Sequence, residues 1–316
     1  MKIVITDGYT LNPGDLSWDE VTNLGDVSYY DRTQSSEIVS RCRDAEILIT
    51  NKTPMRKEHL LELKHLKMIA VTATGYNIVD VDEATKNKVV VCNVPVYGTE
   101  SVAQHTIALL LELVNHVGAN SSSVHDGEWA SASDWCYTKN RIVELKGKTM
   151  GIIGFGRIGE ATARIAQALG MNIIFYNSSL KSNWAKQVTM GELATQSDFI
   201  SIHCPLTPEN NAFVNKRFLA LMKRSAYLIN TSRGALINEC DLADAINQRG
   251  IAGAALDVLS VEPPLKNHPL IGIPNCIITP HTAWLSFDAR ERIMQTTVEN
   301  IRRYQSGNFQ NVVNPF

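Results

Sequence analysis

The sequence contains no long hydrophobic run, which argues against a membrane protein. Its longest apolar stretch with helical character, residues 107–114, is interrupted by Glu112 and is far shorter than the roughly 20 residues that cross a bilayer. The opening MKIVITDGYT has one lysine and an apolar run that ends before Asp7, too short for the core of a signal peptide. We therefore expect a cytoplasmic protein with no membrane partner.

An excess of charge and paired cysteines are also lacking. The 30 Lys and Arg residues nearly balance the 32 Asp and Glu residues, so the chain presents no basic field for nucleic acid. The cysteines are far apart and form no C-x-x-C and no Cys/His pair at metal-ligand spacing. This composition predicts reduced thiols, no metal site, no nucleic-acid partner and a small-molecule ligand. The six cysteines are Cys42, Cys92, Cys136, Cys204, Cys240 and Cys276.

What is present is an alternation of short β-branched runs and amphipathic segments. The 316 residues, 44% of them hydrophobic, suffice for two cores, because single cores stop growing near roughly 250–300 residues. Strands separated by helices predict βαβ units and parallel sheets. The predicted fold class is therefore α/β, with two doubly wound parallel-sheet domains. We expect strands at 2–6, 27–30, 46–50, 67–71 and 89–91, a long helix at 99–117, a second strand series from 149 and a final helix at 287–304.

The sharpest local signal is a glycine-rich turn between a strand and a helical pattern, Gly154-Phe155-Gly156-Arg157-Ile158-Gly159. Gly154 allows a tight turn, Gly156 lets the backbone approach a pyrophosphate, and Gly159 lets the helix approach the strand. The helix that starts at Arg157 and Ile158 directs its N-terminus at the anion. This context predicts a dinucleotide-binding site.

The ribose end of this site departs from the common pattern. An acidic residue usually holds the ribose 2′-hydroxyl about 20 residues after the turn, but here the second strand ends in Asn177 followed by two serines. Asn177 can hydrogen-bond a ribose without repelling a 2′-phosphate, and no arginine adjoins it to bind one. Lys181 and Lys186 could assist a phosphate or simply be solvated. The sequence thus leaves the cofactor open, with NAD(H) favoured and NADP(H) possible.

Three polar residues follow late strand candidates: Arg233, Glu262 and His281. The carboxyl ends of strands face the ligand crevice in a doubly wound sheet. Arg233 offers a planar fork for a carboxylate and a carbonyl, His281 can exchange a proton near neutral pH, and Glu262 could favour its charged form. The alternative for each is a surface charge or a structural histidine. As a set, they suit hydride transfer onto a keto acid.

At these residues the sequence resembles the D-2-hydroxyacid dehydrogenase family, over nearly the whole chain. The matching segments are TATGYNIVD at 72–80, GTESVAQHTIALLL at 98–111, GIIGFGRIGE at 151–160, HCPLTPE at 203–209, NTSRGALIN at 230–238, LDVLSVEPP at 256–264 and TPHTAW at 279–284.

The resemblance implies a flavodoxin-like substrate domain formed by 1–98 and 285–316, a Rossmann-type dinucleotide-binding domain inserted at 99–284, a cleft between them, and a homodimer. It also implies that Arg233 binds the substrate carboxylate and polarises the carbonyl, with His281 as general acid and Glu262 as its partner. The further implied contacts are the backbone around Thr74 and Gly75 with the substrate carboxylate, Asp257 with the nicotinamide carboxamide, His203, Cys204 and Pro205 with adenine, and Thr231 and Gln104 near the nicotinamide.

Within the family, the features ATGYN, VAQHT, LSVEPP and HTAW are most similar to the glycerate dehydrogenase and hydroxypyruvate/glyoxylate reductase branch. This favours D-glycerate and hydroxypyruvate as the substrate pair, with glyoxylate second, and places Asn51, Lys52 and Tyr76 near the substrate side chain. Two alternatives stay open, an NAD(H)-sensing corepressor of the same fold and a dehydrogenase for a larger 2-keto acid.

Overall fold

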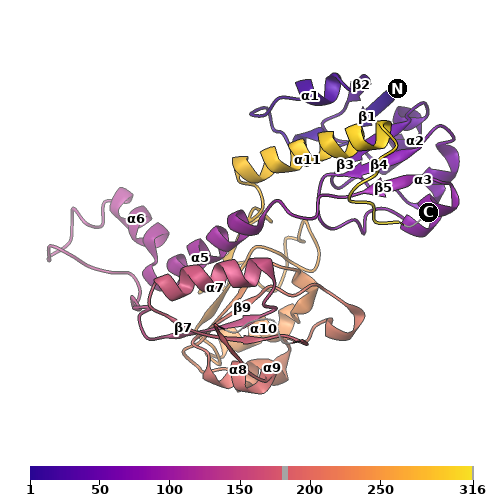
Figure 1. The fold of residues 1–316 in the computed structure, drawn as a ribbon. Helices are drawn as coiled ribbons and strands as arrows, with labels where there is room; N and C mark the ends of the chain where they lie inside the picture. The colour runs from indigo at the N-terminus through magenta and orange to yellow at the C-terminus, as the bar shows by residue number, and fades with distance from the viewer. Residues whose placement is uncertain (180–183, 315–316) are drawn as a thin grey trace. The chain divides into compact units, whose positions relative to one another are not determined.

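The computed structural model describes residues 1–179 and 184–314. The chain divides into two compact units, the first formed by Met1–Gly98 with Leu285–Phe316 and the second by Thr99–Trp284. Each unit is a doubly wound α/β layer structure with an all-parallel sheet (Figure 1). The predicted fold class is therefore confirmed.

The described part of unit 1 is built on five parallel strands in the order β2-β1-β3-β4-β5. The strands β3 and β4 are buried at every position, which explains why their sequences are continuous apolar runs without alternation. The strands are β1 Lys2–Ile5, β2 Asp26–Tyr29, β3 Ile47–Thr50, β4 Met68–Val71 and β5 Val90–Cys92. The helices are α1 Asp19–Thr22, α2 Ile38–Cys42, α3 Lys57–Glu62, α4 Val81–Lys86 and α11 Phe287–Gln305, with 3-10 turns η1 Gly8–Thr10 and η2 Ser35–Glu37.

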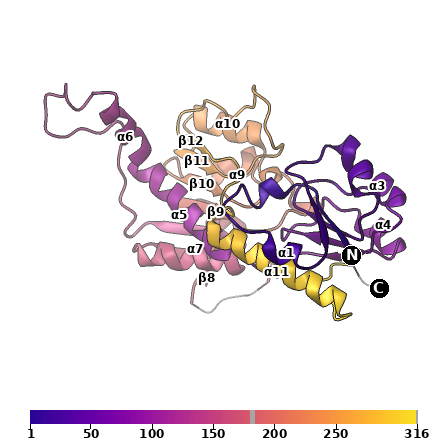
Figure 2. The same cartoon turned by 90° about the horizontal axis from the view of Figure 1, so that it is seen from above.

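The chain end returns to unit 1 through α11, which packs on β4. Figure 2 shows the yellow helix α11 among the indigo and purple elements from the start of the chain. Its N-terminus is capped by the hydroxyl of Ser286, which accepts the Ala289 N–H. The buried guanidinium of Arg290 forms a two-bonded ion pair with Asp15 at 2.7 and 2.6 Å. Further along, the Asn314 amide pairs with the backbone of β5, accepting from Val91. These contacts between distant segments make the two ends of the chain one unit.

Within its described residues, unit 2 holds seven parallel strands in the order β12-β11-β10-β9-β6-β7-β8. The order reverses direction at β6, which pairs with both β7 and β9, and such a switch point is where open α/β sheets bind ligands. The strands are β6 Thr149–Ile153, β7 Asn172–Tyr176, β8 Lys186–Gln187, β9 Phe199–Ile202, β10 Tyr227–Asn230, β11 Gly253–Leu256 and β12 Cys276–Ile278. The helices are α5 Thr99–Asn115, α6 Val117–His125, α7 Arg157–Ala168, α8 Met190–Gln196, α9 Lys216–Leu221 and α10 Glu239–Asn247, with 3-10 turns η3 Pro208–Asn210 and η4 Gly234–Leu236.

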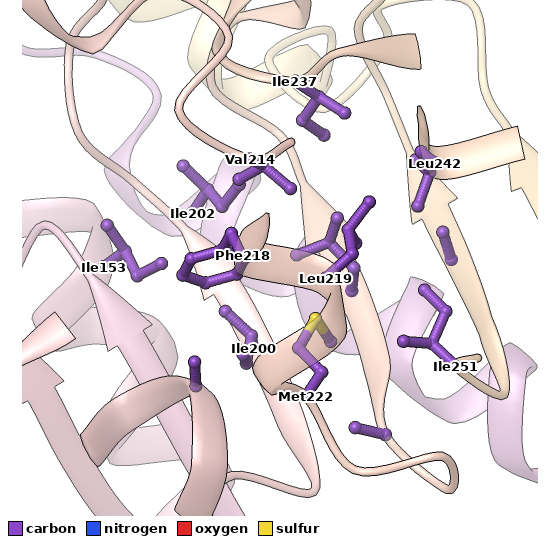
Figure 3. Packing of buried hydrophobic residues seen from close by; sticks show 14 of the residues in the cluster. Ile153, Ile200, Ile202, Val214, Phe218, Leu219, Met222, Ile237, Leu242 and Ile251 are labelled. Carbon is purple, nitrogen blue, oxygen red and sulfur yellow. The ribbon is translucent and has the colours of Figure 1, made fainter. Parts of the chain in front are cut away.

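Two apolar cores cover the faces of this sheet. One lies under α5 and α7, which pack against each other and on the central strands. The other lies under α8, α9 and α10, where Phe218, Leu219 and Met222 meet strand residues such as Ile200 and Ile202 (Figure 3). Both cores support the strand ends from which the candidate site residues emerge.

One element differs from its prediction. The helix expected at 99–117 ends at Asn115, because His116 adopts a left-handed backbone with φ of 51° and a new helix, α6, begins at Val117. Helical periodicity continues across the break in the sequence, so only the backbone reveals it. Across the described ranges, no helix is both long and apolar enough to cross a membrane.

Candidate active site

The glycine-rich turn connects β6 to α7 and is tightly packed on one side. Gly154 has φ of +93°, and a Cβ there would come within 2.5 Å of the Cys204 backbone nitrogen. A Cβ on Gly159 would overlap the Gly154 carbonyl oxygen. These two glycines are therefore required for the turn to fit against the neighbouring strand end and for α7 to begin where it does.

The other side of the turn is open. Gly156 is the N-cap of α7, and a Cβ on it would meet nothing within 4 Å. Arg157 is exposed and Ile158 is half-buried in the first turn of this 12-residue helix. An open glycine at a helix N-terminus provides backbone N–H groups and a favourable dipole for an anion, so these residues fit a dinucleotide pyrophosphate.

Asn177 braces this turn rather than projecting freely. Its Oδ1 accepts the Phe155 N–H at 2.8 Å, and its Nδ2 lies 3.5 Å from the Phe155 carbonyl oxygen. The Asn177 carbonyl accepts from the side chain of Gln187. Of the two lysines considered for a phosphate, Lys186 is exposed at the start of β8, and Lys181 lies outside the described residues.

The ends of β9 and β10 are tied together beside the turn. His203 Nε2 and Ser201 Oγ are 2.8 Å apart, and burial lowers the pKa of His203 to about 3, so this ring is neutral at physiological pH. Cys204 accepts the hydroxyl hydrogen of Ser232 on its carbonyl, and burial raises the pKa of its thiol. Pro205 is exposed. The three residues expected at the adenine thus form a neutral, mainly apolar segment.

Asp257, at the end of β11, is a buried anchor with 1% of its surface exposed. Its oxygens accept the Thr279 hydroxyl at 2.6 Å and the backbone N–H groups of Thr282 and Ala283 at 2.9 Å. His105 Nε2 lies 3.4 Å away. Burial raises the pKa of Asp257, but these hydrogen bonds, that of His105 first, outweigh burial and lower it. Contact of Asp257 with a nicotinamide carboxamide stays a prediction.

Glu262 and His281 meet directly. Their Oε2 and Nδ1 atoms are 2.6 Å apart, and Glu262 Oε1 accepts the Leu259 N–H at 3.0 Å. His281 has a left-handed backbone with φ of 55°, and its backbone N–H donates to the carbonyls of Asp257 and Thr279. Since the Glu262 carboxylate accepts a hydrogen bond from Nδ1–H, the ring is oriented with Nε2 as the atom that can exchange a proton with a ligand.

Arg233 follows β10 and is exposed, with its guanidinium donating to the Ser232 carbonyl at 2.7 Å. The next residue, Gly234, packs so closely that a Cβ would overlap the Leu259 carbonyl group. The loop that carries Arg233 therefore lies against the loop that carries Glu262. The structure brings these two predicted loops together and pairs His281 with Glu262.

The remaining predicted residues have mixed surroundings. Thr231 is buried, and its hydroxyl lies 3.0 Å from that of Thr106 on α5, whereas Gln104 is exposed on the same helix. In unit 1, the exposed residue Thr74 donates its hydroxyl hydrogen to the Val94 carbonyl at 2.8 Å, and its neighbour Gly75 is half-buried.

The residues expected near the substrate side chain also lie in unit 1. The Asp7 carboxylate accepts the N–H groups of Asn51 and Lys52. Asn51 is buried, and within the described parts of the chain its Oδ1 has no hydrogen-bond partner. Tyr76 is 40% exposed.

Sequence reasoning missed His105, Thr106 and Thr279. His105 and Thr106 stand beside Gln104 in the segment VAQHT, and Thr279 precedes His281 by two residues, so both quoted motifs contained the signal. Within the described ranges, no three His, Cys, Asp or Glu side chains gather as metal ligands would.

Comparison with known proteins gives one family. The model of the D-isomer specific 2-hydroxyacid dehydrogenase NAD binding domain matches residues 107–283. The chain is 48% identical over 321 residues to a hydroxypyruvate reductase of Blautia hydrogenotrophica, covering 99% of this chain and 100% of that protein. It is 38% identical to a glycerate dehydrogenase of Methylorubrum extorquens, covering 88% of each. A solved acyclic imino acid reductase in complex with NADPH and D-Arg superposes with a TM-score of 0.86 at 33% identity, covering 99% of this chain and 100% of that one. The chain belongs to the D-isomer specific 2-hydroxyacid dehydrogenase family.

Proposed function

We propose that this protein reduces hydroxypyruvate to D-glycerate with a nicotinamide nucleotide, and glyoxylate more slowly. The observation that carries the proposal is the Glu262–His281 pair at 2.6 Å, in the same unit as a glycine turn shaped for a dinucleotide. The names of the relatives at 48% and 38% identity support this substrate pair.

The residues divide the chemistry between them. When bound, the reduced nicotinamide supplies a hydride to the carbonyl carbon of the substrate. His281 donates the proton from Nε2 to the carbonyl oxygen, while Glu262 holds Nδ1–H and stabilises the charged ring. Arg233 binds the carboxylate and polarises the carbonyl. The product is the 2-hydroxy acid, and His281 recovers its proton from solvent.

We assign unit 2 to the cofactor and unit 1 to the substrate. Gly154, Gly156, Gly159 and the first turn of α7 would hold the pyrophosphate. The other proposed contacts are Asn177 with the ribose, His203, Cys204 and Pro205 with adenine, Thr231, Gln104 and Asp257 with the nicotinamide, Thr74 and Gly75 with the substrate carboxylate, and Asn51, Lys52 and Tyr76 with the substrate side chain.

We favour NADH over NADPH, because no arginine adjoins Asn177 to bind a 2′-phosphate. The preference is modest, since Asn177 carries no charge to repel that phosphate, and NADPH use stays open.

The test is kcat/KM for hydroxypyruvate, glyoxylate, pyruvate and a branched 2-keto acid, each with NADH and with NADPH. A site that hydrogen-bonds a hydroxymethyl group rejects the analogue that lacks it, because buried polar groups are left unpaired. We expect hydroxypyruvate to be used best and pyruvate poorly. If pyruvate or the branched acid gave the highest kcat/KM, the assignment of hydroxypyruvate as substrate would be wrong. If no acid were reduced, a nucleotide-sensing protein would be favoured.

We also propose that the protein is a homodimer. The segment formed by α6 and residues 126–142 extends beyond the end of α5, away from the sheet of unit 2 (Figure 1). It displays apolar side chains to solvent, with Trp135 86% and Trp129 52% exposed. Exposed aromatic clusters of this kind are typical of protein interfaces, and a second copy of the chain is the partner that we assign to them.

A further inference from the structure

The loop between β11 and β12 carries Glu262 and is mostly exposed. Of residues 260–269, all of which the structure describes, His268 alone is not exposed. The segment is bracketed by two core residues, Leu259 and Leu270. An exposed irregular loop of this length opens easily, yet Glu262 must stay within hydrogen-bond distance of His281 to act on it. The contacts that hold the loop therefore matter for the pair.

One carboxylate outside the described pair binds this loop at two points. Glu239, the first residue of α10, accepts the N–H and the hydroxyl hydrogen of Ser260 at 2.7 and 2.5 Å. It also lies 3.0 Å from Nε2 of His268, and the two side chains are only 12% and 8% exposed. Since Ser260 and His268 stand on either side of Glu262 in the sequence, Glu239 closes the base of the loop that carries Glu262.

The partners of Glu239 require a group that only accepts. Nδ1 of His268 accepts the Leu270 N–H at 3.3 Å, which leaves the ring proton on Nε2 to be donated to Glu239. The Ser260 N–H is also a donor. A glutamine amide would turn its NH₂ toward one of these two donors in either orientation, and would leave that donor without an acceptor. The charged carboxylate satisfies both.

The backbone at Leu259 and Ser260 links Glu239 to the proposed catalytic residues. The Leu259 N–H donates to Glu262, and the next N–H along the chain donates to Glu239. Gly234 packs on the Leu259–Ser260 peptide so closely that a Cβ would overlap it, and Gly234 follows Arg233. A shift of this peptide would therefore be felt at Glu262 and beside Arg233.

We propose that Glu239 is a positioning residue for the Glu262–His281 pair. By fixing Ser260 and His268, it keeps the Glu262 carboxylate against His281. The inference rests on the proposed function, in which the charged His281 ring donates a proton to the keto acid, so the rate falls at alkaline pH. A Glu262 carboxylate that is held loosely stabilises the charged His281 ring less than one held against it. Loss of Glu239 therefore lowers kcat and moves this alkaline limb to lower pH.

The experiment compares Glu239→Ala and Glu239→Gln with the parent, using the 2-keto acid that the parent reduces best. A displacement of about 1 Å at a reacting group costs about 10²-fold, so we expect kcat to fall about 10- to 100-fold in Glu239→Ala. Glu239→Gln should lose about 3- to 10-fold, because it keeps the shape. The alkaline limb should move down by about half a pH unit or more in both, with KM for the nucleotide nearly unchanged.

Glu192 provides the matched control. It stands in the first turn of α8, where its carboxylate likewise accepts an N–H and a hydroxyl, both from Thr189 at 2.8 Å. Glu192→Ala and Glu192→Gln should leave kcat and the pH profile unchanged.

Each outcome decides the inference. The inference would be overturned if Glu239→Gln kept the kcat and the pH profile of the parent. It would also be overturned if the variant were less stable to heat but the alkaline limb of its pH–rate profile did not move. If Glu239→Ala does not fold, Glu239→Gln alone decides. Failure of the proposed function is separate, since a parent that reduces no keto acid, or a His281→Ala variant with full activity, would refute that function first.

Discussion

At the scale of single residues, His281 is the side chain whose loss should separate chemistry from binding. Replacing His281 with Ala should lower turnover by about 10²–10⁴-fold and leave NADH affinity nearly intact, because its role is proton donation. The measurements are kcat and the NADH dissociation constant from fluorescence titration. His65→Ala, at an exposed position in unit 1, is the control. Near-parental turnover in His281→Ala would remove His281 from the mechanism.

Asn177 shows what spacing in a sequence can and cannot indicate. The glycine turn predicts which position in the sequence should contact the ribose of the cofactor, and Asn177 occupies that position. Its amide, however, is bonded to Phe155 of the turn, a contact that depends on how β7 lies beside β6. The sequence indicated the position, and the tertiary structure determined the bonds.

The charge at position 177 should set the cofactor preference. In Asn177→Asp, one oxygen keeps the Phe155 N–H, while the new charge repels a 2′-phosphate. We expect the ratio of kcat/KM for NADH to that for NADPH to rise about tenfold. Asn172→Asp, an exposed position at the start of β7, makes the same charge change away from the turn. An unchanged ratio in Asn177→Asp would mean that the 2′-position of the cofactor lies elsewhere.

At the scale of elements, Asp257 joins β11, α5 and the segment after β12. Its two carboxylate oxygens accept hydrogen bonds from the backbone N–H groups of Thr282 and Ala283. An asparagine amide has one oxygen, so it could accept only one of these two hydrogen bonds. Asp257→Asn should therefore reduce the free energy of unfolding at pH 7 by about 2–4 kcal/mol, measured by urea denaturation. Asp44→Asn, at an exposed position, should have little effect.

The pH dependence of this effect has a definite sign. The pKa of Asp257 is below its ordinary value in the folded protein, so the ionised carboxylate contributes stability at pH values above the unfolded pKa of about 3.9. That contribution is lost as the pH falls through the folded pKa. The difference between parent and Asp257→Asn should thus be full at pH 7 and shrink below about pH 4. A difference that grows on acidification would contradict this account.

Elements were predictable where the signal was local. The buried strands of both sheets are short apolar runs, and the β6–α7 junction is marked by glycines that the packing requires. The left-handed turn at His116 and the binding of Ser260 and His268 by Glu239 were not predictable. Both depend on neighbours that are distant in the sequence or on a backbone angle that residue type does not specify.

At the scale of the whole molecule, the exposed aromatic residues of the α6 segment should control assembly. We expect sedimentation equilibrium to give a dimer for the parent. Trp135→Ser should weaken the association about 10- to 100-fold, because buried tryptophans carry much of an interface's binding energy. Leu221→Ser, an exposed apolar position on α9, should remain dimeric. A monomeric parent would refute the proposed homodimer.

The return of α11 to the first sheet has a consequence for synthesis on the ribosome. Unit 2 is one continuous stretch, Thr99–Trp284, so a nascent chain can complete it as soon as Trp284 emerges. Unit 1 cannot be completed then, because Asp15 still lacks Arg290 and β5 still lacks Asn314. The part that is translated first is therefore finished last, and the apolar surface of β4 that α11 covers stays exposed while all of unit 2 is made. Chaperones that bind the nascent chain should accordingly bind unit 1.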